Sequence, residues 1–271
     1  MLLRYRLLLA DLVSELRGRM GMTEKEVEIR MPDGTADGVL FQPEGDKKLP
    51  GVMHLPDIGG VRPAHREMAK RLAGEGYLVL LPNVFYRAGK SPVWEFPFKM
   101  GEERTMKRMG ELASSLPPDN IVKDVSAYVE FLEAQKSVSP ALMGAVGYCF
   151  TGAMALRAAA ARPEKIGAAA SFHGGALFTD KPSSPHTVLP EVKARLYFGH
   201  AEGDPYMDQE AIAKLDAALA AWSTTSGGKY ESEVYTGAHH GWTVPDSPVY
   251  NKPEAELAYG KLRELFKVAL R

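Results

Sequence analysis

A single cysteine lies where a reactive side chain would be expected. Cys149 is the only cysteine among the 271 residues, and it comes between the apolar run 143–146 and an alanine-rich stretch. Gly147 and Gly152 flank it in the sequence G-Y-C-F-T-G. A buried strand that turns sharply into a helix exposes the residue at the turn, and small residues let the two backbones approach closely. The pattern predicts a nucleophile elbow, with cysteine as the nucleophile and Thr151 where a second glycine is usual.

Downstream residues could activate this thiol. A free thiol has a pKa of about 8.5, so a nucleophilic cysteine needs a base or a positive neighbour. Asp204 follows one buried run, and the pair His239 and His240 follows the last one. The chain order nucleophile, acid, histidine is that of α/β-hydrolases, and the ends of parallel strands are where such sheets build their sites. We therefore predict a triad of Cys149, Asp204 and one of the two histidines.

Each of these residues also has a plainer interpretation. A cysteine with apolar neighbours is often an inert core residue, and an aspartate before a helix often caps it. His54 and His173 end predicted strands, where they either line the cleft or are hydrogen-bonded in the core. The alternative function is a non-catalytic or redox-sensing protein that uses its thiol for oxidation or ligand binding. The flanking glycines and the order of acid and histidine favour the enzyme.

Charge and composition narrow the partners. The 33 Lys and Arg nearly balance the 34 Asp and Glu, which gives a net charge of -1 and no basic footprint for nucleic acid. We expect a small-molecule substrate, no nucleic acid and no membrane span, and either a monomer or a homodimer. A lone cysteine cannot form an internal disulfide, which favours a cytoplasmic location. The histidines show no metal-ligand spacing such as H-E-x-x-H, so no metal or other cofactor is expected.

Short apolar runs alternate with helical patterns along the chain. Strands are predicted at 27–30, 38–42, 51–55, 77–81, 143–146, 167–172, 196–199 and 230–235, and helices at 62–74, 120–134, 150–161, 208–222 and 253–270. Repeated strand-helix units predict an α/β protein with a mostly parallel sheet of about eight strands and helices on both faces. The first two strands would form an antiparallel hairpin around the turn 32–34.

Two segments fall outside this alternation. Residues 1–22 carry leucines at helical spacing and are predicted as an N-terminal helical extension, which leaves a single domain at 23–271. Within that domain, the segment 88–118 mixes aromatic and methionine side chains with charges of both signs. Long irregular segments in compact domains are usually functional, so this one is a possible cap over the site. The alternative is a surface excursion whose aromatic residues anchor it.

From Val27 to the C-terminus the chain resembles the dienelactone hydrolase family. The resemblance is carried by 56–62, 82–87, the elbow and 237–242. The last motif reads G-A-x-H-G-F in that family, which aligns His240 with the catalytic base and leaves His239 beside it. The resemblance implies an α/β-hydrolase fold that hydrolyses small esters or lactones, with Cys149 forming an acyl-thioester and Asp204 as the acid, without metal.

Further residues are expected around this triad. The backbone N–H groups of Ile58 and Phe150 would form an oxyanion hole, in which one donor typically contributes about 3 kcal/mol. Substrate binding or gating of the thiol is expected of Asp57, Arg87, Tyr148 and Trp242.

The resemblance also bears on the substrate. The family usually has Glu, which holds the resting thiol, where this chain has the shorter Asp57. Arg87 matches an arginine that pairs with a substrate carboxylate, although it could equally be a structural ion-pair partner. Val244 stands in place of a second arginine. The pocket is therefore expected to be less selective for anions than that of a dienelactone hydrolase.

Overall fold

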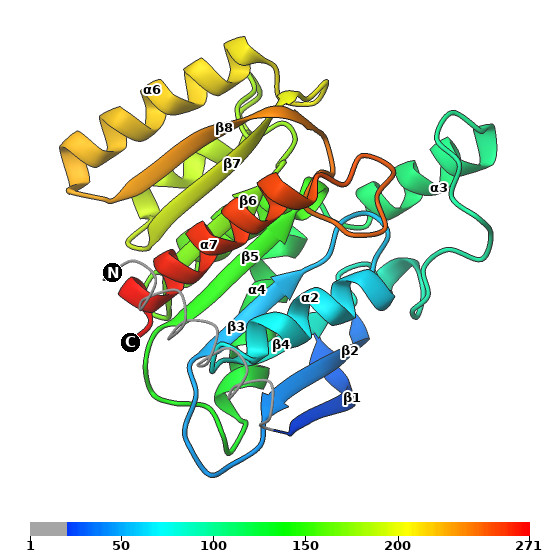
Figure 1. Cartoon of the computed structure of the whole chain (residues 1–271), viewed down its shortest axis with the longest axis vertical. Coiled ribbons are helices and arrows are strands. Elements are labelled where there is room, and N and C mark those ends of the chain that lie inside the picture. The colour runs from blue at the N-terminus through cyan, green and yellow to red at the C-terminus, as the bar shows by residue number, and fades with distance from the viewer. Residues whose placement is uncertain (1–20) are drawn as a thin grey trace, which may run out of the picture.

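The structure is a computed structural model that describes residues 21–271 (Figure 1). Its strands are β1 (Met22–Met31), β2 (Gly34–Pro43), β3 (Gly51–Leu55), β4 (Leu78–Pro82), β5 (Met143–Tyr148), β6 (Ile166–Phe172), β7 (Arg195–Gly203) and β8 (Tyr230–His239). Its helices are α2 (Pro63–Ala73), η1 (Tyr86–Ala88), α3 (Glu103–Ser114), α4 (Pro118–Glu133), η2 (Cys149–Thr151), α5 (Gly152–Ala161), η3 (Pro185–Glu191), α6 (Gln209–Ser226) and α7 (Lys252–Ala269). Of the helical extension expected at 1–22, residues 1–20 lie outside the described residues; Gly21 precedes β1 and Met22 begins it.

One eight-stranded sheet runs through the described chain in the order β1-β2-β4-β3-β5-β6-β7-β8. The hairpin β1–β2 is antiparallel, and β2 also pairs antiparallel with β4. The strands from β4 to β8 are parallel to one another. The predicted α/β-hydrolase architecture, with its N-terminal hairpin and mostly parallel sheet, is thereby confirmed.

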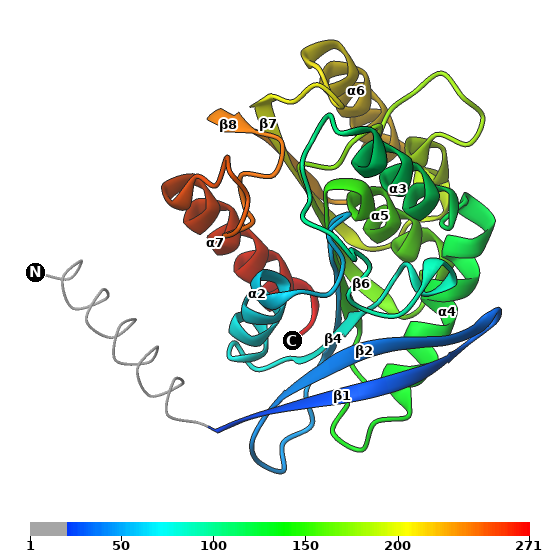
Figure 2. The same ribbon diagram turned by 90° about the vertical axis from the view of Figure 1, so that its right-hand side faces the viewer.

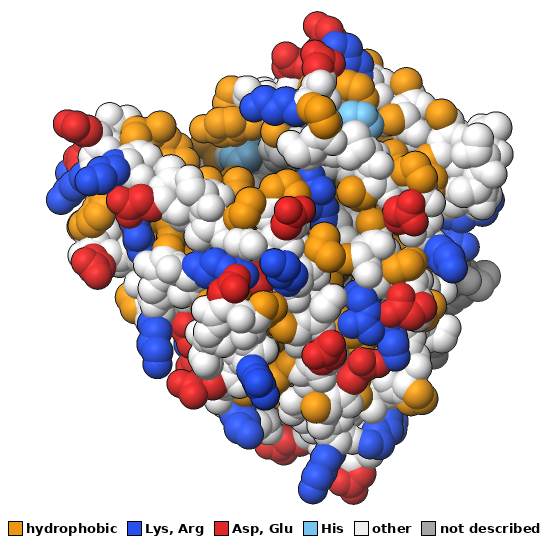
Figure 3. All heavy atoms as spheres, turned by 180° about the vertical axis from the view of Figure 1, so that it is seen from behind, with side chains coloured by type: hydrophobic (Ala, Val, Ile, Leu, Met, Phe, Trp, Pro, Cys, Tyr) orange, Lys and Arg blue, Asp and Glu red, His pale blue; other side chains and the backbone are white. Residues whose placement is uncertain are grey.

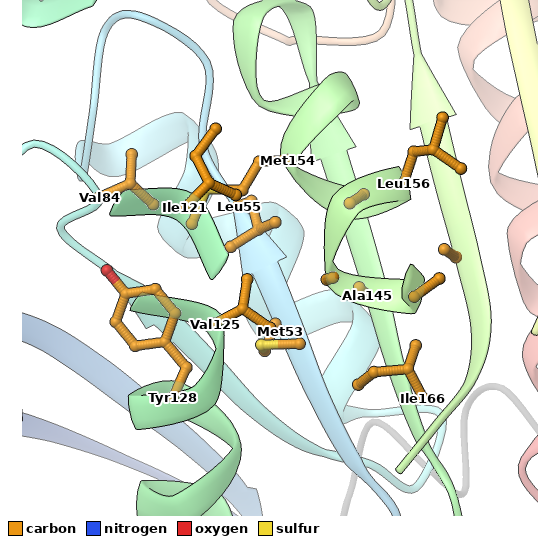
Figure 4. Close-up of a cluster of buried hydrophobic side chains, with 14 of the residues drawn as sticks. Met53, Leu55, Val84, Ile121, Val125, Tyr128, Ala145, Met154, Leu156 and Ile166 are labelled. Carbon is orange, nitrogen blue, oxygen red and sulfur yellow. The ribbon is translucent and has the colours of Figure 1, made fainter. Parts of the chain in front are cut away.

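Helices cover both faces of the sheet. Figure 2 shows α2 and α7 on one side and α3, α4, α5 and α6 on the other. Alternate residues of a strand point to opposite faces, and β4 shows this: Leu78 and Leu80 join the core under α4 and α5, while Val79 and Leu81 join the core under α2 and α7. Figure 4 shows the first of these cores, where side chains of α4 and α5 meet those of β3 and β5.

Beyond small shifts at the ends of several elements and the unpredicted η3, three differences stand out. Strand β1 begins five residues before the predicted Val27, because its first part, T-E-K-E, lies at a solvated sheet edge where no apolar alternation is required. Strand β8 continues to His239 and makes that residue the last of the strand. Helix α3 was not predicted, because its few apolar residues lie among many charged ones and only Thr105 and Leu112 on it are buried.

The segment 88–118 is tied to the body at several points. The Ser91 N–H donates to Oδ2 of Asp37 at 3.0 Å, and the side-chain amide of Asn83 donates to the Gly89 carbonyl at 2.9 Å. Val93 is buried, and α3 stands at the outer right-hand edge of the molecule in Figure 1. These contacts show an anchored segment; whether it acts as a cap remains a prediction. In the part of the chain that the structure describes, no helix has both the length and the apolar character to cross a membrane.

Candidate active site

Strand register brings the predicted catalytic residues to one edge of the sheet. Tyr148 lies opposite Phe172 in the β5–β6 ladder, so the residues that follow, Cys149 and His173, leave the sheet next to each other. Gly203 lies opposite His239 in the β7–β8 ladder, and the residues that follow are Asp204 and His240. Parallel strands end at the same edge, so side chains that are far apart in sequence converge there.

The elbow at Cys149 has the expected strained geometry. Cys149 has a φ of 56°, in the left-handed region that non-glycine residues rarely adopt. A Cβ at Gly147 would lie 2.0 Å from the carbonyl oxygen of Thr151, so only glycine fits there. Thr151 accepts a hydrogen bond from the Tyr148 N–H at 3.0 Å and donates to the Leu55 carbonyl at 2.8 Å. The residue that departs from the usual pattern therefore joins the elbow to β3.

The predicted acid and base form a close pair. The Nδ1 of His240 lies 2.7 Å from Oδ2 of Asp204, whose side chain is almost fully buried. The other oxygen of Asp204 accepts from the Tyr206 N–H at 2.9 Å. Asp208, and not Asp204, caps α6 by accepting from the Ala211 N–H. The interpretation of Asp204 as a helix cap is thus wrong, and its carboxylate lies against the imidazole of His240 instead.

The second nitrogen of His240 is turned away from the acid. Its Nε2 is buried and makes no hydrogen bond of ordinary geometry with the described residues. Burial disfavours the imidazolium, but the hydrogen bond with Asp204 and the nearby Cys149 outweigh it and raise the pKa of His240 to about 10. His239 is exposed instead, with its ring beside Gly203. The structure therefore brings His240 to the thiol and leaves His239 at the surface.

The predicted oxyanion donors lie at the same edge of the sheet. Phe150 follows the nucleophile in η2, and Ile58 comes three residues after the end of β3; both are partly buried. Trp94 of the segment 88–118 donates its Nε1–H to the Ile58 carbonyl at 3.0 Å. Sequence reasoning did not predict this bond, which fixes the loop that carries one of the two donors.

Asp57 forms an ion pair with an arginine. Arg62 binds both of its carboxylate oxygens, at 2.5 and 2.9 Å, and Gly59 N–H donates to it at 2.8 Å. The same guanidinium binds Asp246, in the loop beyond His240, at 2.8 and 2.9 Å. Burial raises the pKa of Asp57, but His65 and Arg62 outweigh it and hold that pKa well below its ordinary value. Asp57 is thus a fixed anion whose oxygens face Arg62, and the predicted contact with the thiol is not among its hydrogen bonds.

Arg87 is also held by carboxylates. Its two terminal nitrogens bind the Asp124 oxygens at 2.6 and 2.8 Å, and its Nε donates to Asp33 at 2.8 Å. The Asp124 side chain is fully buried and the Arg87 side chain is 14% exposed. This geometry favours the structural alternative for Arg87, because all three of its nitrogens already have acceptors.

Tyr148 and Trp242 lie in the core and not at an open surface. Both rings belong to the core under α2 and α7, where Tyr148 stacks on Phe172 with ring centroids 5.7 Å apart. Burial holds the pKa of Tyr148 well above its ordinary value. The structure therefore buries both rings, and their predicted role in substrate binding or thiol gating stays a prediction.

Sequence reasoning left the role of His173 open, and the structure places it against the nucleophile. Its Nδ1 lies 3.0 Å from the Cys149 backbone nitrogen, and its Nε2 lies 2.8 Å from Oγ1 of Thr243. The ring is fully buried and meets the His240 ring edge to face, with centroids 5.2 Å apart. Its position directly after an apolar strand was the only signal in the sequence.

One face of the molecule is hollowed. Figure 3 shows a hollow on the rear face of the molecule, rimmed by hydrophobic side chains, with a histidine inside it. A separate cavity of about 60 Å³ lies between α2, α7 and the loop after His240, where Tyr148 and Thr243 are among its walls. No member of the triad lines that cavity. Among the described residues, no cluster of three or more His, Cys, Asp or Glu side chains could hold a metal ion.

Comparisons with known proteins give a family match over most of the chain. A sequence model described as the dienelactone hydrolase family matches residues 36–270. A carboxymethylenebutenolidase of Rhodococcus opacus is 29% identical over 202 residues, which cover 73% of each chain. A Bradyrhizobium protein described as a probable 2-oxo-3-(5-oxofuran-2-ylidene)propanoate lactonase is 27% identical over 224 residues, which cover 81% of this chain and 84% of that one.

Solved structures share the fold. The structure of a dienelactone hydrolase-like promiscuous phosphotriesterase from metagenomic libraries superimposes with a TM-score of 0.74 at 20% identity. The dienelactone hydrolase from Anabaena variabilis gives a TM-score of 0.58 at 22% identity. In both cases the match covers 92% of this chain and 99% of the other.

Proposed function

The chain belongs to the dienelactone hydrolase family, and on that premise we propose that it hydrolyses small, neutral esters or lactones with Cys149 as nucleophile, His240 as base and Asp204 as the orienting acid. The observation that carries the proposal is the His240–Asp204 pair at 2.7 Å beside a cysteine in left-handed conformation. Side chains of this kind act as a unit whatever their order in a chain.

The first half of the reaction forms a thioester. Asp204 holds His240 with Nδ1 toward itself, and the raised pKa of His240 favours the imidazolium, so the proton of the Cys149 thiol moves to Nε2. A lone pair of the sulfur forms a bond to the carbonyl carbon, and the π-electron pair of the carbonyl moves onto its oxygen. When the tetrahedral species collapses, the C–O bond breaks and the His240 proton goes to the departing alkoxide. A lactone opens at this step and its alcohol remains attached to the acyl group.

The second half returns the enzyme to its resting state. Neutral His240 takes a proton from water, the resulting hydroxide adds to the thioester carbonyl, and the C–S bond breaks to release the acid. In both halves the carbonyl oxygen carries negative charge, which the backbone N–H groups of Phe150 and Ile58 would stabilise. Donors placed in advance in this way typically contribute about 3 kcal/mol each. The hydrogen bond from Trp94 to the Ile58 carbonyl would hold one of them in position.

The charge around the site favours an uncharged substrate. Arg62 is bound by Asp57 and Asp246, Arg87 by Asp124 and Asp33, and Val244 contributes no charge. A guanidinium whose donors are already bound to carboxylates offers little to a further anion. A substrate carboxylate would therefore lose its hydration without gaining a cationic partner. A neutral ester has no charge to desolvate and avoids this cost.

The test is hydrolysis of p-nitrophenyl acetate by the wild type and by Cys149→Ala, His240→Ala and His239→Ala. We expect a burst of p-nitrophenol with the wild type, and a loss of about three orders of magnitude or more with Cys149→Ala and His240→Ala. His239→Ala is the matched control and keeps most of the activity, because its ring is exposed. Mass spectrometry of quenched wild type should find one acyl group, on Cys149. Turnover that survives in Cys149→Ala would refute the nucleophile.

Substrate charge is tested with two aryl esters of similar size. p-Nitrophenyl butyrate is neutral, and mono-p-nitrophenyl succinate carries a carboxylate. We expect kcat/KM to be at least about tenfold higher for the neutral ester, which corresponds to about 1.4 kcal/mol. Equal or reversed values would contradict the inference on charge while leaving the triad intact.

A further inference from the structure

The two hydrogen bonds of the His173 ring assign one nitrogen as acceptor and the other as donor. A backbone N–H can only donate, so the Cys149 N–H requires His173 Nδ1 to be an unprotonated acceptor. A neutral imidazole then carries its proton on Nε2, which must donate to Thr243 Oγ1 at 2.8 Å. Both nitrogens are thereby used, and the tautomer of the ring is fixed by its neighbours.

The surroundings keep this ring neutral. His173 is fully buried, and burial, together with the nearby His240, lowers its pKa well below the ordinary value for histidine. The other charged groups acting on it are Asp57, which favours protonation, and His65, which opposes it. A proton on Nδ1 would set two N–H groups against each other at the elbow, so the arrangement requires the neutral ring.

The contact is made at a strained peptide of the site. A non-glycine residue in the left-handed region costs about 1 to 3 kcal/mol and persists only where its surroundings hold it. Cys149, at φ 56°, is such a residue, and His173 itself has a φ of 41°. Thr243, at the other end of the ring, lies three residues beyond His240 in the same loop. The imidazole therefore spans from the backbone of the nucleophile to the loop of the base.

We propose that His173 is a positioning residue that holds the Cys149 peptide in its left-handed conformation and ties it, through Thr243, to the loop that carries His240. It does not exchange a proton with the substrate. Its effect is on the relative placement of sulfur and imidazole. The inference rests on the proposed nucleophile, and the experiment below separates the two.

The variants remove one contact at a time. His173→Phe keeps an aromatic ring but leaves the Cys149 N–H without an acceptor. His173→Asn restores an acceptor near the position of Nδ1, because its amide oxygen can face the elbow. Thr243→Val removes the acceptor at the far end. The control is His200→Phe, the same substitution at a buried histidine of β7 whose two ring nitrogens make no hydrogen bond with residues 21–271.

The readouts are kcat and KM for p-nitrophenyl acetate and the rate of Cys149 alkylation by iodoacetamide between pH 5 and 9. We expect His173→Phe to lower kcat by about 10- to 100-fold, as is typical when a buried donor loses its partner, with KM changed less than about threefold. Its alkylation rate should fall and follow a shifted pH profile. His173→Asn should recover at least about tenfold of the lost kcat. Thr243→Val should lower kcat by about three- to tenfold, and His200→Phe should match the wild type.

A second measurement does not depend on turnover. In protein labelled with ¹⁵N-histidine, the NMR spectrum should show His173 as the Nε2–H tautomer throughout this pH range. The Nδ1–H tautomer, or an imidazolium at pH 6, would overturn the proposal even if His173→Phe failed to fold.

The outcomes distinguish the two proposals. If Cys149→Ala is inactive but His173→Phe has the kcat and alkylation rate of the wild type, the positioning role is refuted and the nucleophile stands. If His173→Asn is as slow as His173→Phe, ring packing and not the acceptor at the elbow matters, and the proposal is also wrong. If Cys149→Ala retains turnover, the proposed function fails first, whatever the His173 variants do.

Discussion

Replacing Arg87 with alanine should destabilise the protein by about 3 to 5 kcal/mol and leave turnover of a neutral ester almost unchanged. The substitution removes both hydrogen bonds, at 2.6 and 2.8 Å, from the fully buried Asp124 carboxylate. That carboxylate would retain only the Tyr86 hydroxyl, at 3.1 Å. The prediction separates a structural arginine from one that binds substrate.

The magnitude follows from the burial of the pair. Removing one partner of a buried ion pair costs about 3 to 5 kcal/mol, because the remaining charge stays out of water without compensation. The contact with the half-exposed Asp33 adds only about 0 to 1 kcal/mol. Replacing both partners with apolar residues, as in Arg87→Met with Asp124→Leu, should recover most of the loss, since no charge is then left buried.

The assay is urea unfolding followed by tryptophan fluorescence, with the free energy of unfolding extrapolated to water for the wild type, the single variant and the double variant. Activity toward p-nitrophenyl butyrate and mono-p-nitrophenyl succinate is measured in parallel, under conditions where every variant is folded. We expect kcat/KM to change less than about threefold for both esters.

The reasoning would be refuted by the opposite pattern. If Arg87→Ala has the stability of the wild type but raises KM for the succinate ester about tenfold or more, the guanidinium is free to bind a substrate carboxylate. The ion pair with Asp124 would then not describe the working enzyme.

Three further predictions concern the elbow, the oxyanion loop and the base. Gly147→Ala places a Cβ 2.0 Å from the Thr151 carbonyl and should lose more than about 3 kcal/mol of unfolding free energy and most turnover, whereas Gly260→Ala, with open space around its Cβ, should be neutral or stabilising in the same urea titration. Trp94→Phe removes the donor to Ile58 and should lower kcat about tenfold with little change in KM; an unchanged kcat would show that this bond does not position the loop. His240 has a pKa raised to about 10, so its stabilising effect is full below about pH 6.5 and is lost as the pH rises toward 10. The difference in unfolding free energy between the wild type and His240→Ala should therefore shrink from pH 7 to pH 10, and a constant difference would contradict the pair.

Much of the fold could be read from local patterns. Short apolar runs such as 51–55 and 143–146 are typical of strands in a sheet covered on both faces, and the structure has strands there. The prediction of secondary structure failed where few residues of an element are buried. The start of β1 is a solvated edge, and α3 is rich in charged residues and buries only Thr105 and Leu112, so neither stands out in the sequence as an apolar segment.

The sequence alone determined which residues could react. One thiol between two glycines, followed by an aspartate and a histidine that each come directly after an apolar run, limits the chemistry to a few side chains, because strand ends at one sheet edge must converge. The choice between His239 and His240 needed family resemblance, since adjacent residues at a strand end cannot be told apart by pattern.

Only the tertiary structure decided how the charged and polar groups are used. In the sequence, nothing distinguishes Arg62 and Arg87 from arginines that bind a substrate anion. Their partners Asp246 and Asp124 are 184 and 37 residues away along the chain. His173 likewise meets Thr243 across 70 residues. Hydrogen bonds act over about 3 Å in space and carry no periodicity along the chain, so such pairings become visible only once the sheet has brought its strand ends together.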